Sequence, residues 1–450
     1  MKDSLARNGL VLGIIFLFIL AGIIPSIGGS FLDGYVSQNN KSSFIGFNLR
    51  GNIFYVGGNG SGNYTTIQDA IDDASDDDTV FVYDESSPYY ENVVVNKTIN
   101  LIGEDRYTTI IDGNNWGNVV YISADGVYIS GFTIQNSGSN EDDAGIGINS
   151  DYNVIDGNNI NSNNMDGIGL YFSSDNTISY NSISSNGDNA VVIHDSNENT
   201  ISNNIISFND GNGIIIYYPS DNNNIFGNTL RSNNDAGVYI NSSNNYVYHN
   251  NFIHNFRNAY GEANNTWDND FFSGGNYWSD YSGVDNYHGP NQNIPGHDRI
   301  GDFPYKLPSE HGTDFYPVMY PNGWVNEAPV NISIDGQTYG KAGVEYTYNT
   351  SADDPDGDPI YYKFDWSDGS NSNWLGPYPS GNDTWESHSW GIGIFDMKVK
   401  AKDTRGLETN WSKPLRITMP KNKVINNRLF LKFFEHFPTL ERLFILIKII

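Results

Sequence analysis

The chain contains no cysteine among its 450 residues. Disulfide bonds, zinc–thiolate sites and catalysis by a thiol are therefore excluded. Basic residues are also scarce, with 24 Lys and Arg against 53 Asp and Glu and a net charge of −29. Between Tyr107 and Phe256 the only basic residue is Arg231. A surface this acidic repels phosphate backbones, so no nucleic-acid partner is expected, whereas glycans, cations and basic proteins remain compatible.

Residues 1–28 have the layout of an export signal. Lys2 and Arg7 precede an apolar run over residues 9–24, and Pro25 and several small residues follow. A charged start, a short apolar stretch and a small-residue exit are typical of a secretory signal peptide. The run is slightly short for a bilayer span, and both a cleaved signal and an N-terminal anchor fit it. Either one predicts an extracellular, cell-surface or envelope-associated protein.

Residues 421–450 form a basic tail that differs from the acidic centre. Charged and apolar side chains alternate there at helical spacing, and Pro438 divides the segment. Two interpretations remain open: an amphipathic segment that lies on a membrane surface or docks a partner, and a helix that folds back onto its own domain.

The centre of the chain repeats every 22 to 24 residues. An apolar column recurs at Ile155, Ile178, Ile201, Ile225 and Val247. Two asparagine columns follow it, one at Asn158, Asn181, Asn204, Asn228 and Asn250 and one at Asn163, Asn186, Asn209, Asn233 and Asn255. Short alternating strands complete each repeat, with Ile168/Leu170, Val191/Ile193, Ile214/Ile216 and Val238/Ile240 facing inward. Each repeat needs its neighbours to bury its apolar face, so the pattern predicts a parallel β-helix.

The asparagines have two expected roles in such coils. Asparagine tolerates the left-handed backbone needed where a strand turns a corner, and its amide can hydrogen-bond along a stack. Residues 55–71 read as a strand, a Gly-rich turn and a short helix that would cap the first coil. Tyr260 and Glu262 fall where inward apolar residues are expected, so we expect stacking to end near residue 265.

Five segments carry a family resemblance: YTTIQDAI (64–71), NLIGE (100–104), GNYWSDY (275–281), DRIGDFPY (298–305) and DFYPVM (314–319). The first two are similar to the start of pectin-lyase-like β-helices, and the rest, with the Asn-rich coils, resemble the NosD-like subfamily over residues 52–320. The resemblance implies a right-handed parallel β-helix at 52–265 with a NosD-like extension at 266–322, of the carbohydrate-binding and sugar-hydrolase type. Arg299 stands where the family usually has Gly. The family is linked to copper delivery, but a chain with no cysteine and five methionines is not expected to bind copper.

A second domain is expected at 327–420. Strand-like runs at 330–334, 345–348, 360–366, 395–401 and 415–418 alternate with turns, which is typical of a small β-sandwich. DDPDGDPI (353–360) and FDWSDG (364–369) resemble PKD or related Ig-like modules, with Ser367 where Gly is usual. The whole chain is thus predicted to be all-β, and the resemblance implies a spacer or adhesion role for the module.

A ribbon of candidate ligand-binding residues lies outward on the third strand column: Tyr171, Phe172, His194, Asp195, Tyr217 and Tyr218. Aromatic rings along an acidic face suit sugar rings, whose C–H faces stack on them. The alternative is that these rings pack under a loop or the second domain. No catalytic residue is assigned. The alternative of a polysaccharide-degrading enzyme would pair the carboxyl of Asp195 with Asp166, Asp188 or the Asp142–Asp143 pair, and a lyase would use His194 as the base.

Acidic clusters give candidate calcium ligands near turns: Asp298, Asp302, Asp354, Asp356 and Asp358. The alternative is solvated turn acids, and no other cofactor is expected. The function predicted from sequence is an exported β-helix protein that binds polysaccharide or a surface glycoprotein without catalysis, with a membrane surface as a further partner through either terminus. A degrading enzyme and a structural envelope component are the alternatives.

Overall fold

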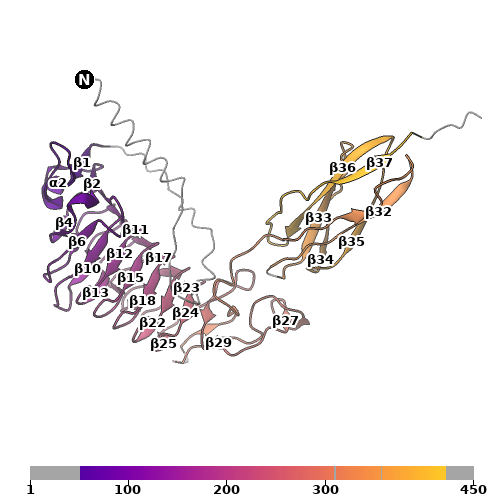
Figure 1. Cartoon of the computed structure of the whole chain (residues 1–450). Helices are drawn as coiled ribbons and strands as arrows, with labels where there is room; N and C mark the ends of the chain where they lie inside the picture. Colours follow the sequence, from indigo (N-terminus) through magenta and orange to yellow (C-terminus); the bar gives the residue numbers. More distant parts are fainter. Residues whose placement is uncertain (1–50, 309–310, 356, 422–450) are drawn as a thin grey trace, which may run out of the picture. The chain divides into compact units, whose positions relative to one another are not determined.

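The computed structural model describes residues 51–308, 311–355 and 357–421. The predicted export signal at 1–28 and the tail beyond Lys421 lie outside the described residues. Within the described part of the chain, no helix is long and apolar enough to cross a membrane. The predicted all-β fold class, a β-helix followed by a small β-sandwich, is confirmed (Figure 1).

The β-helix is built from three parallel sheets whose strands follow one another along each coil. The first sheet consists of β1 (Ile53–Val56), β2 (Thr79–Val82), β5 (Asn100–Gly103), β8 (Tyr128–Ser130), β11 (Val154–Asp156), β14 (Thr177–Ser179), β17 (Thr200–Ser202), β20 (Asn224–Phe226) and β23 (Tyr246–Tyr248). The second consists of β3 (Tyr89–Tyr90), β6 (Ile110–Asp112), β9 (Thr133–Gln135), β12 (Asn159–Asn161), β15 (Ser182–Ser184), β18 (Ile205–Ser207), β21 (Thr229–Arg231), β24 (Asn251–Ile253) and β26 (Tyr277–Trp278). The third consists of β4 (Val93–Val95), β7 (Val120–Ile122), β10 (Ala144–Ile148), β13 (Asp166–Tyr171), β16 (Val191–His194), β19 (Ile214–Ile216), β22 (Ala236–Ile240) and β25 (Arg257–Gly261).

The core of the β-helix is a stack of aliphatic side chains in the predicted register. Ile155 pairs with Ile178, which lies above the next isoleucine of the first sheet, and all of these side chains are fully buried. The helix α2 (Ile67–Asp73) buries Ile67, Ala70 and Ile71 over the first coil, as the predicted cap requires. Thr66 caps its N-terminus by accepting a hydrogen bond from the Asp69 amide. A short 3-10 turn, η1 (Asp84–Ser86), follows β2.

Asparagine ladders stitch the coils together along the corners of the β-helix. In the ladder that begins at Asn158, Oδ1 of Asn181 accepts from both the backbone N–H and the side-chain amide of Asn158, at 2.8 and 3.2 Å. The sequence predicted two such ladders; the structure adds a third, at Asn153, Asn176, Asn199, Asn223, Asn245 and Asn265. The expected left-handed backbone is wrong for the ladder asparagines. On the regular coils it belongs to the residue before the ladder asparagine, such as Tyr180 or Asn203 with φ of 53° and 56°.

The last coil has a different register from the predicted one. In β25, Ala259 and Gly261 take the inward positions, and Tyr260 lies on the outer face beside Tyr239. Parallel pairing then continues beyond residue 265, because β26 pairs with β24 and buries Trp278 against Phe252. The inward register could be shifted by one residue because Ala259 and Gly261 carry no polar side chain and can face the core.

The extension after the coils is closed by one buried carboxylate. It contains the short hairpins β27 (Tyr287–His288) with β28 (Ile294–Pro295) and β29 (Tyr305–Lys306) with β30 (Thr313–Asp314). Asp314 is fully buried and accepts hydrogen bonds from the Asn276 amide, the Trp278 indole and the Tyr316 amide, at 2.7, 2.8 and 3.0 Å. Desolvation raises its pKa to about 7 against the effect of these donors.

The second domain is a sandwich of two antiparallel sheets. One contains β31 (Asp335–Gly336), β32 (Glu345–Thr350) and β35 (Thr384–Ser389); the other contains β34 (Leu375–Tyr378), β33 (Ile360–Asp365), β36 (Gly393–Asp403) and β37 (Leu415–Met419). Its core packs Tyr348, Tyr362, Phe364 and Trp390. The predicted strand over 330–334 is wrong, since only Val330 forms a bridge there, and β34 and β35 were not predicted.

Candidate functional site

A hollow of about 410 Å³ opens on the outer face of the third sheet. Its lining consists of Asn118, Tyr121, Asp142, Gly147, Asn149, Tyr171, Phe172 and His194. Three successive strands, β7, β10 and β13, place Tyr121, Gly147 and Gly169 side by side in register on this face. The two glycines contribute no side chains, so neighbouring side chains lie directly on the sheet. A Cβ built on Gly147 would lie 2.8 Å from Nδ2 of Asn118, so the Asn118 amide and Gly147 together form the bottom of the hollow.

The predicted ribbon residues are brought together on neighbouring coils. Tyr171 pairs in register with His194, and their ring centroids are 6.3 Å apart. The His194 ring also lies 6.2 Å from the ring of Phe172, edge to face, and 5.9 Å from that of Tyr217. Phe172 is 67% exposed and Tyr218 is 73% exposed. Three of the six predicted ligand-binding residues therefore line the hollow itself, and Tyr217 continues its wall.

Tyr171 folds back over the sheet instead of projecting outward. A Cβ built on Gly169 would lie 2.5 Å from Cε2 of the Tyr171 ring, so only glycine permits this placement. Desolvation, with the carboxylates of Asp166 and Asp142 nearby, raises the pKa of Tyr171 above its ordinary value. The phenol consequently stays protonated and can donate a hydrogen bond at the mouth of the hollow.

Sequence reasoning missed the half of the hollow that β7 and β10 supply. Tyr121, Asn118 and Asn149 lie on less regular coils, upstream of the clear repeat. The signal that could have found them is the glycine pair Gly147 and Gly169, because a β-helix strand with outward glycine leaves room for another group.

The candidate carboxylates have separate positions. Asp142 lines the hollow together with His194. Asp143 is buried and accepts from the backbone and side-chain amides of Asn140 within its own loop. Asp195 lies beyond β16, with its carboxylate 3.6 Å from Nδ1 of His194. Asp166 accepts a hydrogen bond from Asn189 on the next coil, and Asn189 lies six residues before Asp195. Because a strand extends about 3.3 Å per residue, Asp195 and Asp166 are too far apart to act as a glycosidase pair.

Asp166 is a buried carboxylate at the other end of β13. It accepts from the backbone and side-chain amides of Asn189, at 3.0 and 3.1 Å, and Asn189 accepts in the same way from Asn212. Desolvation raises the pKa of Asp166 to about 7. This position thus continues a short side ladder in which the other two members are asparagines.

Asp166→Asn is expected to stabilise the protein at pH 8. The folded-state pKa lies above the ordinary value of 3.8, so the folded protein holds the proton more tightly and Asp166 makes stability fall as the pH rises from about 4 to about 7. Asparagine keeps the acceptor for Asn189 without the buried charge, with a gain on the order of 2 kcal/mol at pH 8.

Thermal unfolding at pH 5 and pH 8 measures this effect. The gain should be large at pH 8 and small at pH 5. The control is Asp235→Asn, which removes one exposed carboxylate three coils further along the β-helix and should change stability little at either pH. Equal gains for both variants, or a loss for Asp166→Asn at pH 8, would contradict the assignment.

The candidate calcium ligands accept hydrogen bonds within loops. Asp302 accepts from the amides of Asn286 and Tyr287, and Asp298 accepts from Gly289, Gln292 and Ile300. In the sandwich, Asp354 accepts from the Asp358 amide, and Asp358 forms an ion pair with Arg405 at 2.8 Å. Asp356 lies outside the described residues. Arg299, where the family usually has Gly, has a φ of 67°, which explains the preference for glycine at that position.

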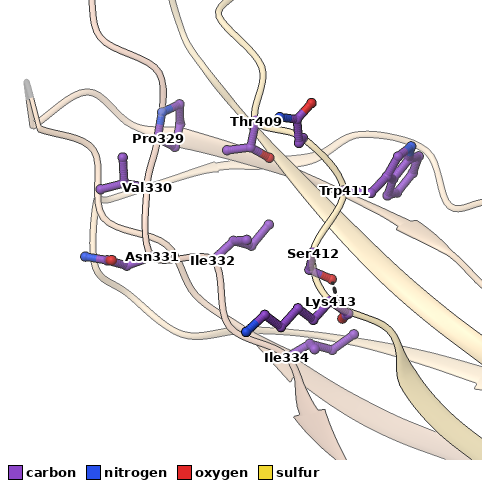
Figure 2. Close-up of a pocket in the computed structure, with 10 residues that line it drawn as sticks. Pro329, Val330, Asn331, Ile332, Ile334, Thr409, Trp411, Ser412 and Lys413 are labelled. Atoms are coloured by element: carbon purple, nitrogen blue, oxygen red, sulfur yellow. Dashed lines mark hydrogen bonds between the residues drawn. The ribbon is translucent and has the colours of Figure 1, made fainter.

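A second hollow, of about 580 Å³, lies in the sandwich and was not predicted. Figure 2 shows its two sides, the segment 329–334 with Ile332 and Ile334 and the segment 409–413 with Trp411 and Lys413. The failure of 330–334 to form a regular strand opens this groove, because Val330 alone bridges to Asp353.

Comparison with known proteins agrees with this architecture. Residues 71–283 match the family model described as periplasmic copper-binding protein (NosD). No curated protein matches the chain. Among solved structures, the PKD domain of an M14-like peptidase from Thermoplasmatales archaeon SCGC AB-540-F20 is 39% identical, over 22% of this chain and 100% of that one, with a TM-score of 0.21. Pectate lyase Pel9A is 14% identical, over 53% of this chain and 83% of that one, with a TM-score of 0.32.

A similar result is found with the enzymatically active domain of bacteriophage CBA120 tailspike protein 2, which is 13% identical over 80% of this chain and 74% of that one, with a TM-score of 0.34. The predicted resemblance of the coils to NosD is confirmed, and the second domain is similar in sequence to a PKD domain. A periplasmic family agrees with the expectation of an exported protein.

The copper named by the family description does not fit this chain's residues. Copper sites in proteins use imidazole, thiolate and thioether ligands. Over residues 51–308, 311–355 and 357–421, no group of three or more His, Cys, Asp and Glu side chains is placed to hold a metal ion. His249, a half-buried histidine, is instead hydrogen-bonded to the Ser273 carbonyl at 2.7 Å and stacked on Trp324.

Proposed function

We propose that this protein is an exported, surface-associated β-helix that binds a glycan in the hollow of the third sheet, without catalysis. The observation that carries the proposal is the hollow itself, with a floor formed by Gly147 and the Asn118 amide and aromatic walls from Tyr121, Tyr171 and Phe172. A flat floor with rings on its sides matches the disc shape of a sugar, whose C–H faces pack on aromatic planes.

Polar groups surround this aromatic surface at its edges. Asn149, His194 and Asp142 line the hollow with amide, imidazole and carboxylate groups, which suit the ring of hydroxyls on a sugar. Beyond the hollow, the aromatic wall continues to the next coils, along the axis of the β-helix, through Tyr217. Successive coils lie roughly 4.8 Å apart, so a chain of sugars, rather than a single one, fits the ribbon.

Phe172→Ala is expected to weaken binding of a neutral polysaccharide about tenfold, because a stacking ring contributes on the order of 1.4 kcal/mol. Tyr217→Ala should act in the same direction. Mobility in native gels that contain the polysaccharide measures the effect. The matched control is Phe208→Ala: Phe208 is 56% exposed with a φ of 59°, against 67% and 53° for Phe172, but it lies after β18 of the second sheet. Equal mobility shifts for the two phenylalanine variants would refute the site.

The alternative of a polysaccharide-degrading enzyme rests on one observation, that Asp142 and His194 line the same hollow. Incubation of the protein with the same polysaccharide, followed by a count of new reducing ends, distinguishes the two alternatives. New ends that disappear in Asp142→Asn would establish catalysis. Slower migration of the protein in the polysaccharide gel without new reducing ends supports binding without catalysis. If the protein neither binds nor cleaves the polysaccharide, a structural component of the cell envelope is favoured.

A further inference from the structure

A cluster of lysines lies on the outer face of the four-stranded sheet of the sandwich. β33 buries Tyr362 and Phe364 in the core and turns Tyr361 and Lys363 outward. β36 is shifted so that its lysines face the same way: Lys402 pairs with Tyr361, and Lys400 pairs with Lys363. The strict alternation of these two strands therefore places like charges on adjacent strands of one surface.

These lysines converge on aromatic rings. The ammonium groups of Lys402, Lys400 and Lys363 lie 4.3, 5.2 and 5.9 Å from the ring centroid of Trp374. Lys400 also lies 5.4 Å from the ring of Trp411, which is 40% exposed at the edge of the second hollow (Figure 2). We call Tyr361, Lys363, Trp374, Lys400, Lys402 and Trp411 the lysine–tryptophan face.

The positive charge of this face is only partly balanced. Lys400 forms an ion pair with Glu408. In the described part of the chain, Lys363 and Lys402 have no ion-pair partner. Cation–π contacts of this kind contribute on the order of 0.5–1 kcal/mol each at exposed sites and do not neutralise charge. In a chain of net charge −29, these lysines without an ion-pair partner form a local positive surface. A bound anion would neutralise their charge.

We propose that the lysine–tryptophan face binds an acidic polysaccharide, whose sugar rings carry carboxylates. Lys363 and Lys402 supply point charges for successive carboxylates, and the indoles of Trp374 and Trp411 supply planes for the rings between them. Carboxylates of a second copy of this acidic chain would satisfy the lysines but make no use of the exposed part of the Trp411 ring, which favours the glycan. This inference is independent of the proposed function, because it concerns a different domain and a charged ligand.

The test uses the double variant Lys363→Gln/Lys402→Gln in the full chain. The probes are polygalacturonate and a neutral glucan of matched length, in about 0.15 M salt, where charges more than about 8 Å away are largely screened. The wild type should bind polygalacturonate, and the double variant should bind it at least tenfold more weakly. The control is Lys306→Gln/Lys341→Gln, which removes the same charge from two lysines outside the face and should bind as the wild type does.

Three results would overturn the proposal: a wild type that does not bind polygalacturonate, a double variant that binds it normally, and equal losses in the control pair. Sedimentation without polysaccharide adds a fourth, since an oligomer abolished by the double variant would assign the face to contacts between copies. Unchanged thermal unfolding of the double variant shows that any loss is one of binding. Because the Phe172→Ala test uses a neutral polysaccharide, the two sites can fail separately.

Discussion

Asn204→Ala is expected to lower the free energy of unfolding of the β-helix by about 3–5 kcal/mol, because it removes the side chain that joins three coils. The Asn204 amide donates to the carbonyls of Ile178 and Ser202 and to Oδ1 of Asn228, at 2.9, 3.0 and 3.0 Å. Its Oδ1 accepts the backbone and side-chain N–H groups of Asn181 at 2.9 and 3.1 Å. Alanine leaves the buried Asn181 amide and Ile178 carbonyl without these partners.

Hydrogen exchange of the Asn181 amide and thermal unfolding measure this effect. Exchange should accelerate in the coils next to residue 204 first, because each repeat is stabilised mainly by its neighbours. The control is the adjacent Asn203→Gly. Asn203 is exposed and has a φ of 56°, so glycine meets the backbone requirement and little stability should change. Similar losses from both substitutions would show that asparagine content, and not the ladder, matters.

Asp314→Ala is expected to cost about 3–5 kcal/mol and to loosen the extension from the last coil. The substitution leaves the amides of Asn276 and Tyr316 and the indole N–H of Trp278 without their acceptor in a fully buried site. Asn276 is also the terminal member of the ladder that begins at Asn158, since its Oδ1 accepts from the Asn250 backbone N–H at 2.9 Å. The ladder and the extension should therefore weaken together.

Urea unfolding followed by tryptophan fluorescence tests this, with a shift of Trp278 emission to longer wavelength as the local signal. Asp302→Ala is the control within the same extension. Its carboxylate accepts from the Asn286 and Tyr287 amides at an exposed loop, so water can replace it at a cost below about 1 kcal/mol. An Asp314→Ala protein as stable as this control would contradict the role of Asp314.

Much of the fold was predictable because a β-helix is a one-dimensional stack. A residue such as Ile178 contacts its counterparts one repeat away, so the spacing of 23 residues in the sequence is the contact map itself. The same logic failed at the last coil, where Ala259 and Gly261 replace larger aliphatic residues. Tyr260, which lies on the outer face, was therefore assigned to an inward position. The third asparagine ladder was equally periodic, at Asn153 and Asn176, and was open to the same method.

Periodicity in the sequence predicts the stacking axis, the inward columns, two of the ladders and the aromatic ribbon at Tyr171, His194 and Tyr217, because all of these features recur from one repeat to the next. The tertiary structure was needed to locate the hollow, since Tyr121 and Asn149 reach it from irregular coils. Tyr171 can fold back over the outer face of the sheet only because residue 169 is glycine. The tertiary structure also decided the lysine–tryptophan face, because the antiparallel register that sets Lys402 beside Tyr361 depends on strands about forty residues apart. Periodicity reveals contacts between equivalent positions, whereas sites join positions that are not equivalent.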